Sequence, residues 1–558
     1  MFRVKTILSD DAGRRKNFYR AKWSEKSIGE ARQGRFPVIE DGGVAAKDGK
    51  IIAVGTAADM EPYIGPHADV IGAEGLVLTP GFVECHMHAL ETGVQMRNIN
   101  CHDVTSRAKI LDLVKEKVAT VQPGEWVVGN GWNELVWADD QSYITRRDLD
   151  EIAPDNPVVL TRSCFHVLVA NSLALEAAGI DASTPDPEGG IIEHYDDGEP
   201  NGLLHENSAM YLVLDAVPAL TLDQRIEGLE LVGARLNELG ITGVIDANLT
   251  FPQMRTYLET KKRGKLSYRA NLMFYLDPHL GDPMDNLRRL EEMDCLTGFG
   301  DAFLKMNGIK VTLDGIPATY TAYMREGYKT RPDYCGSTMF TEEQITAFAR
   351  KAAELGWQFG IHTIGDACAD MALRAYQKAN EVAPIWDSRW YLIHYQFPQD
   401  DQWPIMRDLN VGVCLQPTIV STMGEAPQFY EEQALRIQSP GLMFKNGVLA
   451  GGSSDSPVVS PDPMMGMYYA ITRLDETTGD TLSKGDESKV TRKQALIMWT
   501  KNAAFFSHDD DKMGSVEVGN FADLCLFDHD FLEGDIEDYR TTKVFMTILD
   551  GKVVYERK

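Results

Sequence analysis

The chain lacks the basic surplus and the long apolar segments that mark several classes of protein. Its 55 basic residues are outnumbered by 83 acidic ones, which gives a formal net charge of −28. Nucleic acids and anionic membranes are bound through basic patches, so neither is an expected partner. No apolar run approaches the ~18–20 residues of a membrane-spanning helix, so we expect no membrane insertion.

Paired cysteines and a signal peptide are lacking too. The eight cysteines are scattered without a CxxC pair, which favours reduced thiols over a disulfide framework or a zinc ribbon. The N-terminal stretch 1–8 runs directly into Ser9-Asp10-Asp11, with no signal-peptide core or cleavage site. A cytoplasmic location is therefore the expectation, and a homodimer is the commonest assembly for such a chain.

What is present is the composition of an ordinary globular protein, with 44% hydrophobic and 25% charged residues. A length of 558 residues predicts one large domain with at least one smaller one. Short apolar runs separated by Asp-Gly turns occupy 36–79 and return after residue 514. Because Asp-Gly between apolar runs is a hairpin signal, we expect a small composite β-sandwich domain from residues 1–79 and 496–558.

Between the two ends the pattern changes to buried strands alternating with amphipathic helices. This α/β repeat is typical of a parallel barrel, here expected over 80–495. Residues from about 95 to 235 do not fit one repeat and are expected to form an insertion after the first strand. The first strand ends near His88, and the other seven candidates are 241–247, 270–276, 308–313, 358–363, 391–395, 411–416 and 447–452.

The first of these strands ends in two histidines, within the stretch Pro80–His88. In a strand, side chains alternate between faces, so His86 and His88 point the same way and Glu84 lies one step deeper. Two imidazoles at a strand end can hold a metal ion, but a zinc-type site needs at least three protein ligands. The remaining ligands must come from other strands.

Reactive groups of such barrels lie at the C-terminal ends of the strands. Those positions hold Lys310, His362, His394 and Asp455. Each has an ordinary alternative, since single histidines often pack structurally, a strand lysine is often an edge residue and an aspartate beside serines often caps a turn. Together with His86 and His88, they predict a metal site.

At this point the sequence resembles the amidohydrolase superfamily. Pro80–His88 is similar to its PGFID-x-H-x-H signature, and within the superfamily the amidohydrolase-3 group of YtcJ-like metal-dependent hydrolases is the nearest likeness. The further matching segments come in the family's order: 162–175, 308–315, 361–366, 393–395, 452–457 and 514–527.

The resemblance implies a distorted (β/α)8 barrel and a metal site of His86, His88, His362, His394 and Asp455. Lys310 stands where binuclear members carry a carboxylated lysine between two metals, and Glu206 is an alternative bridging ligand. The expected cofactor is one or two divalent ions, Zn²⁺ first, with Mn²⁺, Fe²⁺ or Co²⁺ as alternatives. The sequence departs from the signature at Glu84, where an aspartate is usual, and this change is expected to rearrange the inner edge of the site.

The implied activity is hydrolysis of an amide-type carbon–nitrogen bond, such as an N-acyl or N-formyl bond, in a small molecule by metal-activated hydroxide. Asp455 would carry the proton from the hydroxide to the leaving nitrogen. His166 is a candidate oxyanion donor or substrate contact, with a structural role as the alternative. Two other functions stay open: a mononuclear deaminase of a heterocycle, and a catalytically inactive scaffold.

Overall fold

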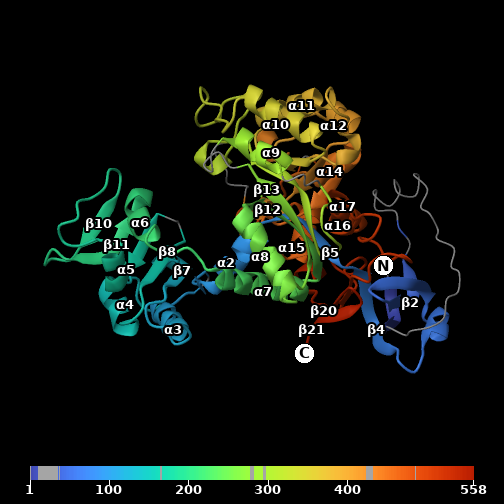
Figure 1. Cartoon of the computed structure of the whole chain (residues 1–558), viewed down its shortest axis with the longest axis horizontal. Coiled ribbons are helices and arrows are strands. Elements are labelled where there is room, and N and C mark those ends of the chain that lie inside the picture. The colour runs from blue at the N-terminus through green and yellow to red at the C-terminus, as the bar shows by residue number, and fades with distance from the viewer. Residues whose placement is uncertain are drawn as a thin grey trace. The chain divides into compact units, whose positions relative to one another are not determined.

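The computed structural model describes residues 2–9, 36, 38–102, 104–163, 166–276, 282–292, 297–422, 431–483 and 485–558 (Figure 1). The chain divides into two compact units, one of Met1–Thr92 with Val232–Lys558 and one of Gly93–Leu231. Within the described residues, no helix combines the length and the apolar character that crossing a membrane requires. The part of the expected β-domain at 10–35 lies outside the described residues.

The larger unit contains a parallel sheet of eight strands in the order β18-β17-β16-β15-β14-β13-β12-β5. The sheet is nearly closed, and in the loop after β18 the Asp455 amide donates to the His86 carbonyl on β5 at 3.0 Å. This confirms the predicted barrel-type α/β fold. The strands are β5 (Phe82–Met87), β12 (Ile241–Leu249), β13 (Arg269–Tyr275), β14 (Leu304–Thr312), β15 (Gln358–Thr363), β16 (Tyr391–His394), β17 (Gly412–Leu415) and β18 (Ala450–Gly452).

Two predicted strand boundaries were wrong. The strand expected from residue 308 begins at Leu304, because Leu304 and Met306 already pair with β13. The strand expected from residue 447 begins at Ala450, because Gly447 ends helix α14 (Pro440–Asn446) with a left-handed φ of 70°. Glycine is the usual residue at such a helix end, since it lacks the Cβ that opposes this conformation.

Helices follow most barrel strands, and α10 buries one face. In α10 (Glu342–Glu354) the buried residues include Ile345, Phe348, Ala349 and Ala352, which confirms the helix expected from this spacing. Figure 1 shows α10, α11 and α12 grouped together above the barrel strands. The other helices of this unit include α8 (Phe251–Lys262), α9 (Pro283–Glu292), α11 (Asp366–Asn380), α12 (Trp403–Leu409), α15 (Pro463–Thr472), α16 (Arg492–Met498) and α17 (Lys501–Phe506).

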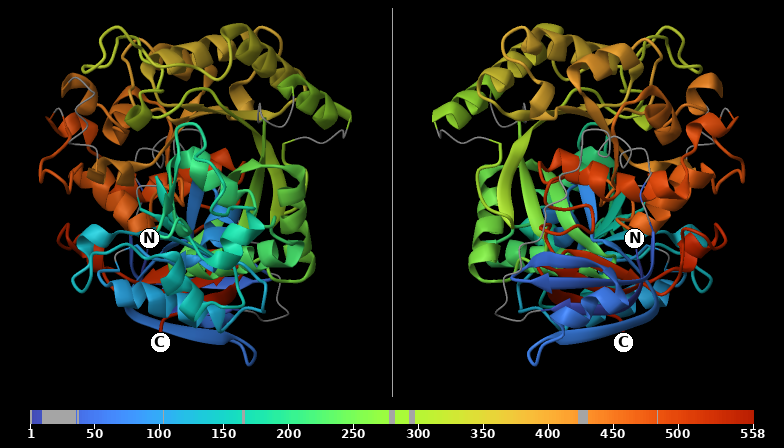
Figure 2. Two further views of the ribbon diagram at one scale, coloured as in Figure 1. Left: turned by 90° about the vertical axis from the view of Figure 1, so that its left-hand side faces the viewer. Right: turned by 90° about the vertical axis from the view of Figure 1, so that its right-hand side faces the viewer.

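A second sheet of this unit joins strands from both ends of the chain, in the order β21-β20-β19-β4-β1-β2-β3. Both views of Figure 2 show its red C-terminal strands beside its blue N-terminal ones. Two of its hairpins turn at Asp48-Gly49 and Asp550-Gly551, and all four of these residues have positive φ, as a two-residue type I′ turn requires. The strands are β1 (Phe2–Ser9), β2 (Ile39–Lys47), β3 (Lys50–Thr56), β4 (Asp69–Pro80), β19 (Leu524–Phe527), β20 (Val544–Leu549) and β21 (Lys552–Glu556).

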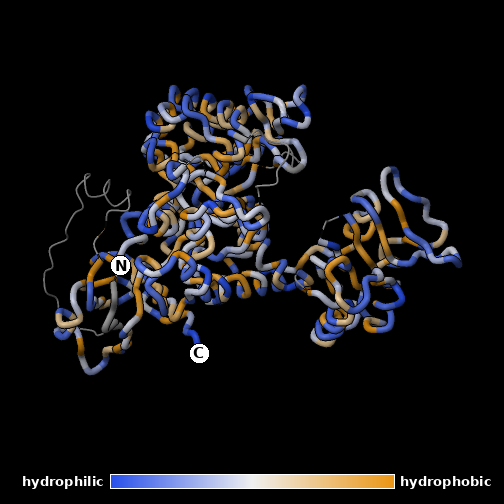
Figure 3. Tube along the Cα trace, turned by 180° about the vertical axis from the view of Figure 1, so that it is seen from behind, coloured by the Kyte–Doolittle hydropathy of each residue, from blue (hydrophilic) through white to orange (hydrophobic). Residues whose placement is uncertain are grey.

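The unit of Gly93–Leu231 is a six-stranded sheet with a hydrophobic core on each face. Along β8, Val158 and Leu160 pack into one core and Val159 into the other, as strand alternation requires. Figure 3 shows hydrophobic stretches of this unit in orange between hydrophilic blue ones. Its elements include β6 (Ile99–Asn100), α3 (Arg107–Val118), β7 (Val127–Trp132), α4 (Arg146–Ile152), β8 (Val158–Arg162), β9 (Val167–Ala170), α5 (Ser172–Ala177), β10 (Ile191–His194), β11 (Pro200–His205) and α6 (Glu206–Leu214).

A buried ion pair joins the barrel to the seven-stranded sheet. Arg269 at the start of β13 donates to both carboxylate oxygens of Asp523 at 2.6 and 2.9 Å, and both side chains are at most 2% exposed. We predict that Asp523→Asn lowers the free energy of unfolding by about 3 kcal/mol, because the buried guanidinium keeps only the more exposed Asp550 carboxylate, 3.3 Å away, as a counter-charge. Urea denaturation followed by circular dichroism measures this change.

The matched control is Glu342→Gln, which breaks the exposed pair between Glu342 and Arg374. Exposed pairs contribute at most about 1 kcal/mol, so this variant should unfold almost like the natural protein. Equal, small losses in Asp523→Asn and Glu342→Gln would show that the buried pair does not hold the two sheets together.

Candidate metal centre

One carboxylate oxygen at the carboxyl end of the barrel strands faces two imidazole nitrogens. Asp455 Oδ1 lies 3.1 Å from His86 Nε2 and 3.2 Å from His88 Nε2. The ligand atoms of His86, His394 and Asp455 all lie within 4.8 Å of one another, and all three residues are buried. These residues come from β5, the end of β16 and the loop after β18, so the barrel brings together positions up to 369 residues apart in the chain.

The other two predicted residues lie against this group. The ring centre of His362, at the end of β15, is 4.4 Å from that of His394. Lys310 Nζ, on β14, is 3.4 Å from His86 Nε2, and the Lys310 side chain is buried. The structure therefore gathers His86, His88, Lys310, His362, His394 and Asp455 in one place.

Hydrogen bonds determine which nitrogen of each imidazole keeps a lone pair that could bind a metal ion. His394 Nδ1 lies 2.7 Å from Gln416 Oε1, and His88 Nδ1 lies 3.3 Å from the Ala247 carbonyl oxygen. Both partners are acceptors, so each Nδ1 carries the proton and each Nε2 keeps its lone pair. Burial lowers the pKa of His394 to about 4, so this ring is neutral at physiological pH.

This arrangement fits a bound cation. An aspartate carboxylate is an acceptor only, and so is an imidazole Nε2 whose ring carries its single proton on Nδ1, yet Asp455 Oδ1 and His88 Nε2 face each other at 3.2 Å. His362 Nε2 and Asp455 Oδ1 are also buried without a hydrogen-bond partner among the described residues. Buried polar atoms are almost always satisfied, and a divalent ion shared by these nitrogen and oxygen atoms would satisfy them.

Glu84, at the signature position where an aspartate is usual, contacts two backbone amides. Its Oε1 accepts the amide protons of His86 at 3.2 Å and of Ser454 at 3.1 Å, so it ties β5 to the loop that carries Asp455. Burial raises the pKa of Glu84 to about 8. The Glu84 carboxylate therefore links the backbone of β5 to the backbone of the loop that carries Asp455.

Two buried carboxylates of the centre were missed as site residues. Asp246, on β12, accepts the Leu90 amide at 3.0 Å and the Tyr257 hydroxyl, and burial raises its pKa to about 6. Asp314 accepts three backbone amides at 2.9 Å, and its Oδ1 lies 3.8 Å from His362 Nε2. For Asp246 the sequence did contain an indication of a site residue, namely a charged side chain within an otherwise apolar strand.

His166 and Glu206 lie in the unit of Gly93–Leu231 and pair with each other. His166 Nδ1 is 2.8 Å from Glu206 Oε2, and the two side chains are 60% and 54% exposed. The carboxylate fixes the proton on Nδ1 and leaves Nε2 of the neutral ring as an acceptor. A hydrogen bond donated from Nε2 requires the ring that carries a proton on both nitrogens.

Comparison with known proteins decides the family. A model of the amidohydrolase family matches residues 69–555, which include every strand of the barrel and all six gathered residues. The chain belongs to the amidohydrolase family. The predicted enzyme class, an amidohydrolase, is thereby confirmed.

Similar proteins cover nearly the whole amidohydrolase chain. The putative amidohydrolase YtcJ of Bacillus subtilis is 27% identical, over 94% of this chain and 98% of its own. The N-substituted formamide deformylase of Arthrobacter pascens is 28% identical, over 92% of this chain and 95% of its own. An uncharacterized metal-dependent hydrolase from Pyrococcus furiosus shares the fold, with a TM-score of 0.70 at 24% identity over 88% of this chain and 95% of that one.

Proposed function

We propose that this amidohydrolase uses one or two divalent ions, Zn²⁺ first, to hydrolyse the amide-type carbon–nitrogen bond of a small N-formyl or N-acyl compound. The observation that carries the proposal is the Asp455 carboxylate oxygen facing Nε2 of His86 at 3.1 Å and Nε2 of His88 at 3.2 Å. The similarity to a formamide deformylase along 95% of that protein supports the N-formyl class.

His86, His88, His362, His394 and Asp455 are the proposed ligands, with Lys310 as a bridging ligand after carboxylation. With a divalent ion bound, these residues would hold a water whose pKa is lowered from ~15.7 towards ~7, and a substrate carbonyl would be polarised there. Asp455 takes a proton from the attacking water and returns it to the leaving nitrogen. The oxygen of water bonds to the carbonyl carbon, the carbon–nitrogen bond breaks, and a carboxylic acid and an amine are released.

A substrate screen tests this proposal. The purified protein, loaded with Zn²⁺ or Mn²⁺, is offered N-formyl amines, N-acyl amines, N-acyl amino acids and cyclic amides, and amine and carboxylate release are both measured. Metal content is determined by mass spectrometry on the same samples. Stoichiometric amine and carboxylate support the proposal. Ammonia released from a heterocycle would instead indicate a deaminase, and protein that retains no metal would indicate an inactive scaffold.

His166 is proposed as a catalytic group that donates a hydrogen bond to the substrate's carbonyl oxygen. We predict that His166→Ala lowers kcat about hundredfold, the effect of removing one oxyanion donor, while metal content stays unchanged. Steady-state kinetics on the best substrate of the screen measure the effect. The control is His194→Ala, an exposed histidine on β10 of the same unit. Unchanged turnover in His166→Ala would assign His166 a structural role.

A further inference from the structure

Gln416, whose Oε1 faces His394 Nδ1, belongs to a longer series of buried hydrogen bonds. Gln416, Gln438 and Arg473 are all fully buried. Gln416 directly follows β17, Gln438 lies two residues before α14, and Arg473 directly follows α15. The series thus connects a candidate metal ligand to two segments that contain none of the six gathered residues.

One backbone amide determines the direction of the hydrogen bonds between these side chains. The backbone N–H of Gln416 can only donate, and it lies 3.0 Å from Gln438 Oε1, so that atom is an oxygen. Gln438 Nε2 is then the nitrogen, and it donates to Gln416 Oε1 at 3.2 Å. Gln416 Oε1 is therefore an oxygen too, and it accepts the proton of His394 Nδ1 at 2.7 Å. The neutral His394 ring keeps its lone pair on Nε2.

The other end of the Gln416 amide agrees with this direction. Gln416 Nε2 donates to the Ser453 hydroxyl at 2.8 Å, and that hydroxyl donates to the Leu415 carbonyl at 2.9 Å. A reversed Gln416 amide would place its NH2 group against that of Gln438, and its oxygen opposite a hydroxyl whose proton is already donated. The buried amide therefore has one favoured orientation, in which its oxygen faces His394.

The backbone of Gln438 is held from both sides. Its φ of 47° lies in the left-handed region, which is uncommon for a residue other than glycine. Arg473 Nη1 donates to the Gln438 carbonyl at 2.6 Å, and Arg473 Nη2 donates to the carbonyl of the preceding residue. The Gln438 N–H donates to the carbonyl of Gln396 at 3.1 Å, two residues after His394. These bonds keep the Gln438 side chain against Gln416.

We propose that Gln438 is a positioning residue of the metal centre, which acts through the Gln416 amide to keep the His394 proton on Nδ1 and Nε2 free to bind the metal ion. The inference rests on the proposed function, because it takes His394 as a metal ligand. Residues that hydrogen-bond metal-binding histidines typically change metal affinity or activity by about 10–100-fold when they are replaced. Here the effect extends one residue further, from Gln416 to Gln438.

The test measures the affinity of the full-length protein for Zn²⁺ by competition with a chelator. Gln438→Met roughly keeps the side-chain volume and removes both side-chain hydrogen bonds, so it should weaken zinc binding about tenfold, as should Gln416→Met. The double variant should also lose about tenfold, not about hundredfold, because both residues act on one imidazole. Gln438→Asn, which is too short to reach Gln416, serves if methionine prevents folding.

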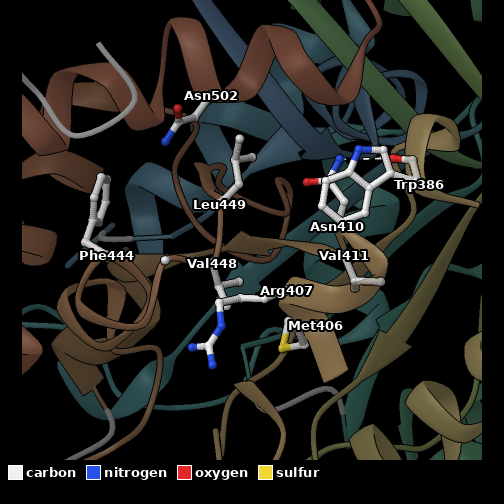
Figure 4. A pocket seen from close by; sticks show the side chains of 10 residues that line it. Trp386, Met406, Arg407, Asn410, Val411, Phe444, Val448, Leu449 and Asn502 are labelled. Atoms are coloured by element: carbon white, nitrogen blue, oxygen red, sulfur yellow. Dashed lines mark hydrogen bonds between the residues drawn. The ribbon is translucent and has the colours of Figure 1, made fainter. Parts of the chain in front are cut away.

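The matched control removes a buried amide at the other end of the barrel strands. Asn502 is 1% exposed, and its Nδ2 donates to the Ala450 carbonyl at 2.9 Å. It lines a pocket together with Val411 and Leu449, which directly precede β17 and β18 (Figure 4). The candidate metal ligands lie at the carboxyl ends of the strands, so Asn502→Leu should leave the zinc affinity unchanged.

Three results would overturn this inference and leave the proposed function standing. The first is a Gln438→Met variant that binds zinc as tightly as the natural protein does. The second is a double variant in which the two losses multiply, and the third is an equal loss in Asn502→Leu, which would show general damage to the core. A natural protein that binds neither Zn²⁺ nor Mn²⁺ would overturn the proposed function and this inference with it.

Discussion

Replacing Asp455 by asparagine is expected to lower kcat about a thousandfold, with most of the fold and much of the metal content retained. Asparagine has the same shape and keeps an oxygen where Asp455 Oδ1 faces His86 and His88. It cannot take up a proton at neutral pH, so it cannot move one from water to the leaving nitrogen. Losing a general acid–base group slows reactions by about 10²–10⁴-fold.

The measurement compares kcat and metal content on the same metal-loaded samples, so that weaker metal binding is not mistaken for lost proton transfer. Asp400→Asn is a matched control, because this aspartate pairs with Arg436 at the surface and its side chain is 82% exposed. Its turnover should equal that of the natural protein. A metal-loaded Asp455→Asn variant with undiminished turnover would remove Asp455 from the mechanism.

The sequence predicted the residues that the structure gathers at this site because their positions follow a rule of local structure. A buried strand can be recognised from its own residues, and in a barrel its carboxyl end faces the site. His362 at the end of β15 and His394 at the end of β16 were found in this way. Neither position required knowledge of which strands are neighbours.

The hydrogen bonds that orient these side chains could not be predicted in this way, because they depend on packing between distant segments of the chain. Glu84 accepts the Ser454 amide, 370 residues away, and nothing in either segment indicates the other. Gln416, directly after β17, likewise accepts a hydrogen bond from His394 Nδ1 and orients that ring. The order of metals, with Zn²⁺ first, stays a prediction, since imidazole and carboxylate ligands suit several divalent ions.

Lys310→Gln is expected to lower the metal content by about one ion per chain, and activity with it, whereas Glu206→Gln should keep the full metal content. An ammonium cannot stay 3.4 Å from His86 Nε2 when that nitrogen holds a cation, because the two positive charges repel. Lys310 must then be neutral or carry a negative group. Burial lowers its pKa to about 8, so the neutral amine is accessible near neutral pH.

The neutral amine can bond to the carbon of carbon dioxide and lose a proton, which gives an anionic carbamate with two oxygens for two ions. Glu206, by contrast, is already paired with His166 at 2.8 Å and is half-exposed. Metal analysis of the two variants separates these bridging candidates. A carbamate signal in ¹³C NMR after growth of the natural protein with labelled bicarbonate, absent in Lys310→Gln, identifies the bridge directly. Loss of metal in Glu206→Gln but not in Lys310→Gln would give that role to Glu206.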